Sequence, residues 1–250
     1  MLLSRAESDD VKLLKINNRN VIQVIDRDTV DITLGAAGKL NATSTGVGLN
    51  GDVLIGSEGV VNVNLVKSTD DQDVRIKAYG SITNARTDTA AAVVGGNIVL
   101  ESSSGSVGTD SAVMRIDQKQ DASLVARAKT EMAISTLDQQ VAGRAVDLRI
   151  SSAYSPNTIH LTSKQGAILD NAWTGEGSIE NGWGTDIKAA NIHLTAAKSI
   201  GLMPATGDTD STIRGKALEI ASVEKLDADG NALQSVIIDG DLVDGVNAVT

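Results

Sequence analysis

Short runs in which apolar and polar residues alternate recur along most of the chain. Each run begins with a small polar residue, continues as apolar–x–apolar, and usually reaches a Gly–x–apolar step after a short polar stretch. Side chains that alternate with a period of two lie on opposite faces of a β-strand. The pattern therefore predicts short strands with one buried face, separated by corners rich in Gly, Ser, Asn and Asp.

These runs form an internal repeat. Its copies begin at residues 31, 52, 73, 97, 123, 158, 191 and 217, in steps of 21, 21, 24, 26, 35, 33 and 26 residues. Such steps are typical of solenoids, propellers and arrays, but a propeller blade needs about 40 residues and aromatic signatures. No helical apolar stripe recurs either. We therefore predict an all-β chain, a right-handed parallel β-helix (β-solenoid) of about eight or nine coils and roughly 40 Å in length.

The longer steps predict loop insertions in the later coils, at residues 136–145 and 171–186. We expect a lead with a candidate first coil at residues 1–30, repeats at 31–226, and a last coil or a junction to further repeats at 227–250. No stretch has the length and apolarity of a signal-peptide core or a membrane helix, so membrane insertion is not expected. Strand pairs without a capping helix at the ends predict a segment of a longer rod, or a subunit that stacks end to end.

Composition narrows the classes of function. Among 250 residues there are no Cys, no Phe, two Trp, two Tyr and two His. The lack of Cys excludes disulfides, thiolate catalysis and Cys-based zinc sites. The lack of Phe fits a narrow interior of stacked Val, Ile and Leu. A formal net charge of −10 argues against binding nucleic acid or an anionic membrane through net charge.

Two segments carry a resemblance to a known family. The first, at residues 96–108, is Gly-Asn-Ile-Val-Leu followed by Gly-Ser-Val-Gly, and the second, at residues 191–201, is Asn-Ile-His-Leu-Thr-Ala followed by Ser-Ile-Gly. Both resemble the repeats of filamentous-haemagglutinin-like bacterial exoproteins and adhesins. The resemblance covers roughly residues 31–226. It implies a right-handed parallel β-helix, secretion to the cell surface, and a role as a rod or stalk. It implies no catalytic residue.

His160 and His193 occupy the same position in two consecutive repeats. Alternation directs both outward if the Ile and Leu residues that flank them point inward. Stacked on one face, the two imidazoles together with a carboxylate could hold a metal ion. The alternative is that both are solvated residues on an outer β-face.

Two further candidate sites lie in loops. Trp173 and Trp183 either cover the core or form an exposed pair that contacts a glycan or a protein partner. Asp227, Asp229 and Asn231 resemble the start of a calcium loop, but Ile238 stands where an EF-hand would place its bidentate Glu. Polar turns are the other explanation of this cluster. We therefore expect no cofactor, with calcium at this cluster as the alternative.

The sequence favours a structural or adhesive segment over an enzyme. Neither His lies in a Ser–His–Asp pattern, and we assign no catalytic residue. The predicted partners are neighbouring repeats or end-to-end copies, and a cell-surface glycan or protein. The predicted location is extracellular. The alternative is a β-helix enzyme, a lyase or glycoside hydrolase, that acts on polysaccharides through paired carboxylates.

Overall fold

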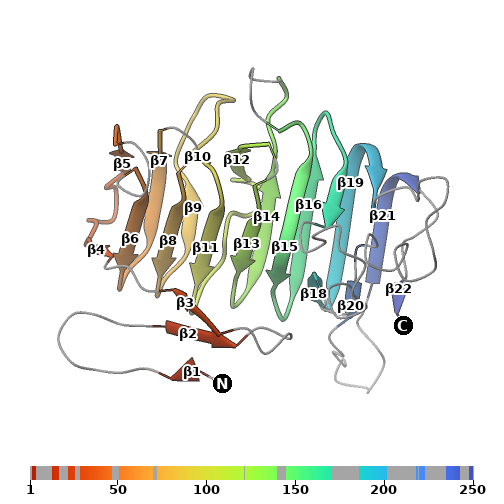
Figure 1. Cartoon of the computed structure of the whole chain (residues 1–250), viewed down its shortest axis with the longest axis horizontal. Helices are drawn as coiled ribbons and strands as arrows, with labels where there is room; N and C mark the ends of the chain where they lie inside the picture. The colour runs from red at the N-terminus through yellow and green to blue at the C-terminus, as the bar shows by residue number, and fades with distance from the viewer. Residues whose placement is uncertain are drawn as a thin grey trace.

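The structure of the protein is a computed structural model. It describes residues 29–46, 51–69, 72–120, 122–139, 145–170, 186–201, 218 and 220–221, with the backbone of the strand residues 2–3, 13–16, 22–25, 222, 235–242 and 248–249. The described part is all-β and contains no helix. Its main feature is a long sheet of 19 strands, in which neighbouring strands run parallel (Figure 1).

The chain winds so that each strand pairs with its equivalent one turn later, which produces parallel ladders along the molecule. Ladder A comprises β4 (Val30–Asp31), β6 (Val53–Ser57), β8 (Val74–Ala78), β11 (Ile98–Ser102), β13 (Leu124–Arg127), β15 (Leu148–Tyr154), β18 (Ile187–Ala189), β20 (Ile220–Ser222) and β22 (Ala248–Val249). Ladder B comprises β5 (Leu40–Thr43), β7 (Val61–Lys67), β9 (Ile82–Asn84), a bridge at Val107, β14 (Glu131–Ser135), β16 (Thr158–Ser163), β19 (Asn191–Ile200) and β21 (Ser235–Leu242).

Further strands complete the described elements. β10 (Val93–Gly95) pairs with the end of β7 and with β12 (Met114–Gln118). β17 (Ile168–Asp170) pairs with the start of β15 and the end of β19. β1 (Leu2–Leu3), β2 (Leu13–Ile16) and β3 (Ile22–Ile25) form a separate antiparallel sheet, so their pairing differs from the parallel stacking of the long sheet.

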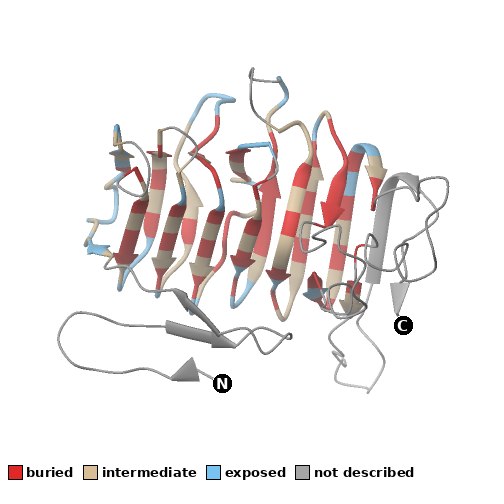
Figure 2. Ribbon diagram, in the orientation of Figure 1, coloured by how far each residue is buried: buried red, intermediate tan, exposed pale blue. Residues whose placement is uncertain are grey.

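The interior is a stack of aliphatic side chains, as alternation predicts. In ladder A the inward positions Val74, Ile98, Leu124 and Ile150 lie in register and are fully buried. Figure 2 shows the buried and less buried positions alternating along the strands. In ladder B the corresponding row is Val61, Ile82, Val107, Met132, Ile159 and Ile192. Each of these six side chains is at most 1% exposed.

The pairings confirm one part of the repeat alignment. The copies at 52, 73, 97 and 123 stack in ladder A, where Val53 pairs with Val74, Val74 with Ile98, and Ile98 with Leu124.

Other parts of the alignment were wrong. The repeat copies that begin at 31 and 52 would pair Ile32 with Val53. In the structure Val30 pairs with Ile55 instead, which shifts the first copy by four residues. Leu124 pairs with Ile150 in ladder A, whereas the copies at 158 and 191 belong to ladder B. An apolar–x–apolar motif therefore does not distinguish the two ladders.

The small polar residues that open the copies at 52, 73, 97 and 123 link successive coils. Asp73 N–H donates to Asp52 Oδ1 at 3.0 Å, and both the N–H and Nδ2 of Asn97 donate to Asp73 Oδ1, at 3.2 and 3.0 Å. Ser123 N–H donates to Asn97 Oδ1 at 3.0 Å, and Ser123 Oγ contacts Ser151 Oγ. Asp52, Asp73 and Asn97 thus each supply an acceptor to the following coil. We call this row, residues 52, 73, 97, 123 and 151, the polar ladder.

Replacing Asp73 by Ala removes the acceptor of two hydrogen bonds from Asn97. We expect a loss of about 1 kcal/mol in the free energy of unfolding, because a typical protein hydrogen bond contributes about that much. Asp73→Asn keeps a side-chain oxygen at the same place and should retain most of the stability. Chemical denaturation of both variants measures the difference. Equal stability of Asp73→Ala and the wild type would contradict the role of the polar ladder.

Hydrogen bonds from two arginine side chains hold the loop between β9 and β10 in place. Arg86 Nε and Nη2 donate to the two carboxylate oxygens of Asp88 at 2.7 and 2.6 Å. Arg115 on β12 donates through Nε to Ala90 O at 3.1 Å and also contacts Asp88 O. The hydrogen bond from Arg86 is the main cause that lowers the pKa of Asp88 to about 2.

This contact gives a pH-dependent prediction. The folded-state pKa of Asp88 lies below its ordinary value of 3.8, so its stabilising effect is present above pH 3.8 and is lost as pH falls through about 2. An NMR titration of the Asp88 carboxyl carbon should show a midpoint near 2 in the wild type. Arg86→Gln should move it back toward 3.8, and Arg75→Gln, in a different ion pair, should leave it unchanged. A wild-type midpoint near 3.8 would refute the assignment.

Candidate functional site

The loop residues predicted as sites lie outside the described residues. This holds for Trp173 and Trp183, the predicted binding pair, and for Asp227, Asp229 and Asn231, the predicted calcium ligands. Their roles stay predictions. Of the insertion at 171–186, Asp186 is described, and it is 2% exposed beside the start of β18.

The two histidines lie side by side on the outer face of ladder B. β16 and β19 pair in parallel over six residues, with His160 opposite His193, flanked by the buried pairs Ile159–Ile192 and Leu161–Leu194. The imidazole centroids are 4.3 Å apart and the ring planes are inclined by 58°. The buried flanking residues confirm the outward orientation that alternation predicted, and the register places the two imidazoles next to each other. The neighbours on the same strands are neutral: Thr158, Thr162, Asn191 and Thr195.

A carboxylate from a distant segment joins the pair. Asp110 Oδ1 contacts His160 Nδ1, although 50 residues separate them in the sequence. Asp110 lies at the tip of a turn in which Thr109 and Ala112 form an antiparallel bridge. Thr109 Oγ1 also accepts a hydrogen bond from the Ala112 N–H at 3.2 Å. The turn therefore presents the carboxylate from a hydrogen-bonded frame.

Gly108 sets the position of this turn. Its φ of +65° belongs to the left-handed region, which disfavours residues with a Cβ. A Cβ there would lie 2.3 Å from the carbonyl oxygen of Ala133, which is the residue paired with His160 on the neighbouring strand. The turn can approach β14 this closely because position 108 is Gly. The close approach brings Asp110 to His160.

Burial and charge distinguish the second imidazole. Desolvation lowers the pKa of His193, and repulsion by His160 lowers it further, while the charge of Asp110 acts in the opposite direction. His193 is therefore held in its neutral form to a lower pH than an exposed imidazole. A neutral imidazole carries a nitrogen lone pair that can accept a proton or bind a metal.

We call Asp110, His160 and His193 the histidine site. In the described part of the chain, no group of three or more His, Cys, Asp or Glu side chains is arranged to hold a metal ion directly. The histidine site therefore offers at most two nitrogen ligands, with the carboxylate behind one of them. Sequence reasoning missed Asp110, because a polar Gly-Thr-Asp-Ser turn carries no signal of where its tip will lie.

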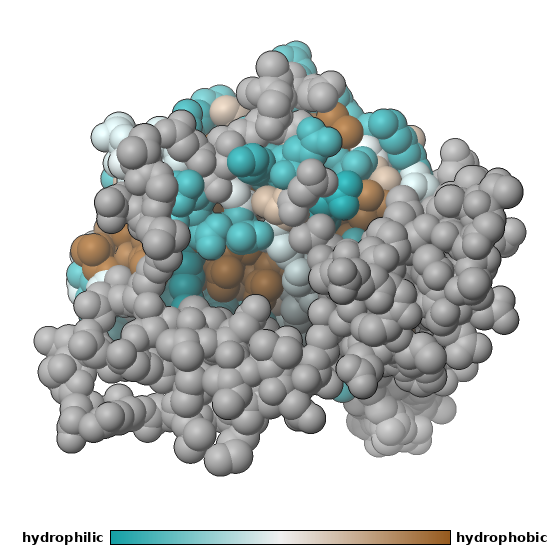
Figure 3. All heavy atoms as spheres, in the orientation of Figure 1, coloured by the Kyte–Doolittle hydropathy of each residue, from teal (hydrophilic) through white to brown (hydrophobic). Residues whose placement is uncertain are grey.

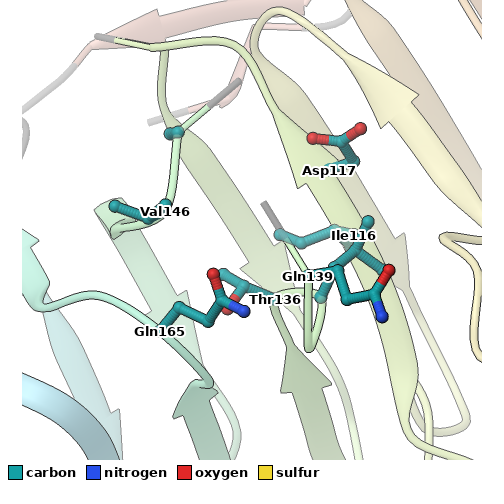
Figure 4. Close-up of a pocket in the computed structure, with 8 residues that line it drawn as sticks. Ile116, Asp117, Thr136, Gln139, Val146 and Gln165 are labelled. Atoms are coloured by element: carbon teal, nitrogen blue, oxygen red, sulfur yellow. The ribbon is translucent and has the colours of Figure 1, made fainter. Parts of the chain in front are cut away.

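A small pocket lies between β12 and the described start of the insertion at 136–145 (Figure 4). Asp117, Thr136 and Gln165 are among the polar residues that line it, and the Gln165 amide donates to Asp138 O. For a water-sized sphere its volume is about 10 Å³, which admits one water and no sugar ring. The pocket is thus too small for a polysaccharide substrate.

Ladder A carries a second notable surface, which we call the cationic row. Lys77, Glu101, Arg127, Tyr154 and Lys188 lie in register at consecutive outward positions. The Glu101 carboxylate is paired with Arg75 at 3.1 Å. Within the described residues, Lys77, Arg127 and Lys188 have no hydrogen-bond or ion-pair partner, and Tyr154 is 39% exposed. Three cations without a partner among the described residues thus occupy alternate positions of one row, on a chain whose net charge is −10.

The outer surface contrasts with the aliphatic interior. On the face seen in Figure 3, hydrophilic side chains cover most of the visible described surface, and separate hydrophobic patches interrupt them. Tyr79, at the corner after β8, is 65% exposed. No helix among the described residues has the length and apolarity required to cross a membrane.

Comparison with known proteins found no match: no protein-family model, no curated protein and no solved structure corresponds to this chain.

Proposed function

We propose that this chain is a structural and adhesive β-solenoid segment of a secreted bacterial surface protein. It acts as a rod, stalk or fibre subunit in contacts at the cell surface. The observation that carries the proposal is the parallel stacking of strands in register, with fully buried aliphatic rows that continue from coil to coil. Such a fold gains length by repetition, and each coil contacts only its neighbours.

The finer architecture belongs to the same proposal. We propose a right-handed parallel β-helix of about eight or nine coils. Right-handedness follows from the strong preference of parallel crossovers for that hand. At about 4.8 Å for each coil, the rod is roughly 40 Å long. Its partners along the axis are neighbouring repeats of a longer chain or end-to-end copies, and its location is extracellular.

The outer faces supply the contacts in this proposal. The cationic row carries positive side chains at every second strand step, about 10 Å apart, with Glu101 and Tyr154 at the steps between them. An extended array of this kind complements acidic groups on a cell-surface glycan or protein. Tyr154 adds an aromatic face on which a sugar ring can pack.

Two measurements test the rod and its adhesive surface. Electron microscopy of the purified chain should show short rods or filaments, and globular particles would contradict the proposal. On a glycan array, acidic glycans should bind, and Arg127→Gln/Lys188→Gln should reduce binding. A matched control is Lys67→Gln/Lys198→Gln, which removes the same charge away from the row and should bind normally. Equal losses in both double variants would show that total charge, and not the row, governs binding.

The polysaccharide-acting enzyme is the competing proposal. Incubation with acidic polysaccharides should leave their chain length unchanged if the role is structural. Turnover that a single Asp or Glu substitution abolishes would overturn the structural proposal and establish the enzyme.

A further inference from the structure

The histidine site has the features of a metal centre that uses two imidazoles. The chain contains only two His, and the fold brings both to one point although 33 residues separate them. Each projects from a central strand of a parallel ladder, and the paired backbone fixes their separation before any ligand arrives. Prior positioning of ligands reduces the entropy that binding must overcome.

Asp110 defines which nitrogen of His160 is available. In a neutral imidazole, a carboxylate at Nδ1 favours the tautomer that carries its proton on Nδ1, and this tautomer has its lone pair on Nε2. A carboxylate that holds one ring nitrogen while the other binds a metal is the usual outer arrangement around metal-ligating histidines. Such a carboxylate fixes the ring orientation and makes the coordinating nitrogen more basic.

The surroundings leave the second ligand available as well. The centroid of the His193 ring lies 4.3 Å from that of the His160 ring, so both imidazoles border the same space on the outer face of ladder B. On the side of β14 the register position next to His160 is Ala133, whose small side chain offers no competing donor. The flanking outward residues on β16 and β19 are Thr and Asn, so no fixed positive charge opposes a cation there.

We propose that His160, through Nε2, and His193 together bind one late first-row transition metal ion of the Zn²⁺, Ni²⁺ or Cu²⁺ class, with Asp110 orienting His160. Imidazole nitrogen suits these ions, whereas Ca²⁺ and Mg²⁺ require oxygen ligands. Two protein ligands leave the remaining coordination positions to water or to a donor group on another molecule. The proposal is independent of the adhesive role.

Isothermal titration of the full chain with Zn²⁺, Ni²⁺ and Cu²⁺ tests the site. Each ion should bind at one ion per chain in the wild type. His160→Gln and His193→Gln should each abolish binding. Asp110→Asn should weaken the affinity by about 10- to 100-fold, the usual effect of losing an outer carboxylate. Glu131→Gln, which removes a nearby carboxylate on β14, is the matched control and should bind like the wild type.

A second readout keeps the test independent of stability. Because there are only two histidines, an imidazole NMR spectrum contains two sets of signals, and Zn²⁺ should shift both together. Circular dichroism should show that all four variants keep the wild-type fold. Binding retained in both His variants would assign the metal to carboxylates elsewhere and overturn the proposal. So would the absence of saturable binding, or a shift of only one imidazole.

Discussion

Ile159→Ala is expected to lower the free energy of unfolding by about 2–5 kcal/mol, the range measured when large aliphatic residues in well-packed cores are cut back to Ala. Ile159 is fully buried on β16, and Met132 and Ile192 lie above and below it in the same row. These neighbours are held by the paired backbone of their own strands. They cannot close around the cavity, so the cost should lie in the upper half of the range.

Urea denaturation of Ile159→Ala measures this loss. Thr162→Ala, on the outward face of the same strand, is the matched control and should change stability by less than about 1 kcal/mol. Comparable losses in the two variants would contradict the assignment of inward and outward faces. The comparison therefore tests the register of β16 as well as the packing of the core.

Gly108→Ala is expected to have the second largest effect. The left-handed φ of +65° alone costs a non-Gly residue about 1–2 kcal/mol. The added Cβ would also lie 2.3 Å from the Ala133 carbonyl oxygen, so the backbone must move. We expect a total loss of about 2–4 kcal/mol, since this backbone strain adds to the cost of the φ angle. Displacement of the turn should also separate Asp110 from His160.

Gly59→Ala provides the control, because the nearest atom to an added Cβ there is Ser57 Oγ at 4.0 Å. Thermal unfolding should show a clear decrease in Tm for Gly108→Ala and little change for Gly59→Ala. If Gly108→Ala retained both the wild-type Tm and the His160 imidazole shift, the close approach to β14 would be disproved.

Much of the fold could be predicted from alternation and repeat spacing. These identified the strands of ladder A from Val53 to Leu124, because each copy there opens with a small polar residue directly before the strand. The alignment failed after Leu124 because Ile159–His160–Leu161 has the same apolar spacing as a ladder A strand but lies in ladder B. Local alternation specifies an inward face and does not specify which side of the coil a strand occupies.

The candidate site was predictable only where it depends on equivalent repeat positions. The stacking of His160 on His193 follows from their shared place in the repeat. Asp110 does not, since its position depends on a glycine-dependent turn that leaves the regular coil. The cationic row was predictable only in part. Lys77, Glu101 and Arg127 occupy equivalent outward positions in aligned repeat copies. Placing Tyr154 and Lys188 in the same row also requires the register of β15, which the repeat alignment did not provide.

The polar ladder has a consequence for how such a chain changes its length. Residues 74–97 make up one full coil, from Val74 to the residue before its partner Ile98. Excising them would join Asp73 to Ile98, so that Asp73 would supply the acceptor that Asn97 now offers to Ser123 N–H. The cut surfaces would still match in register and in hydrogen bonding. Whole coils are therefore the natural units in which this molecule can be shortened or lengthened by recombination.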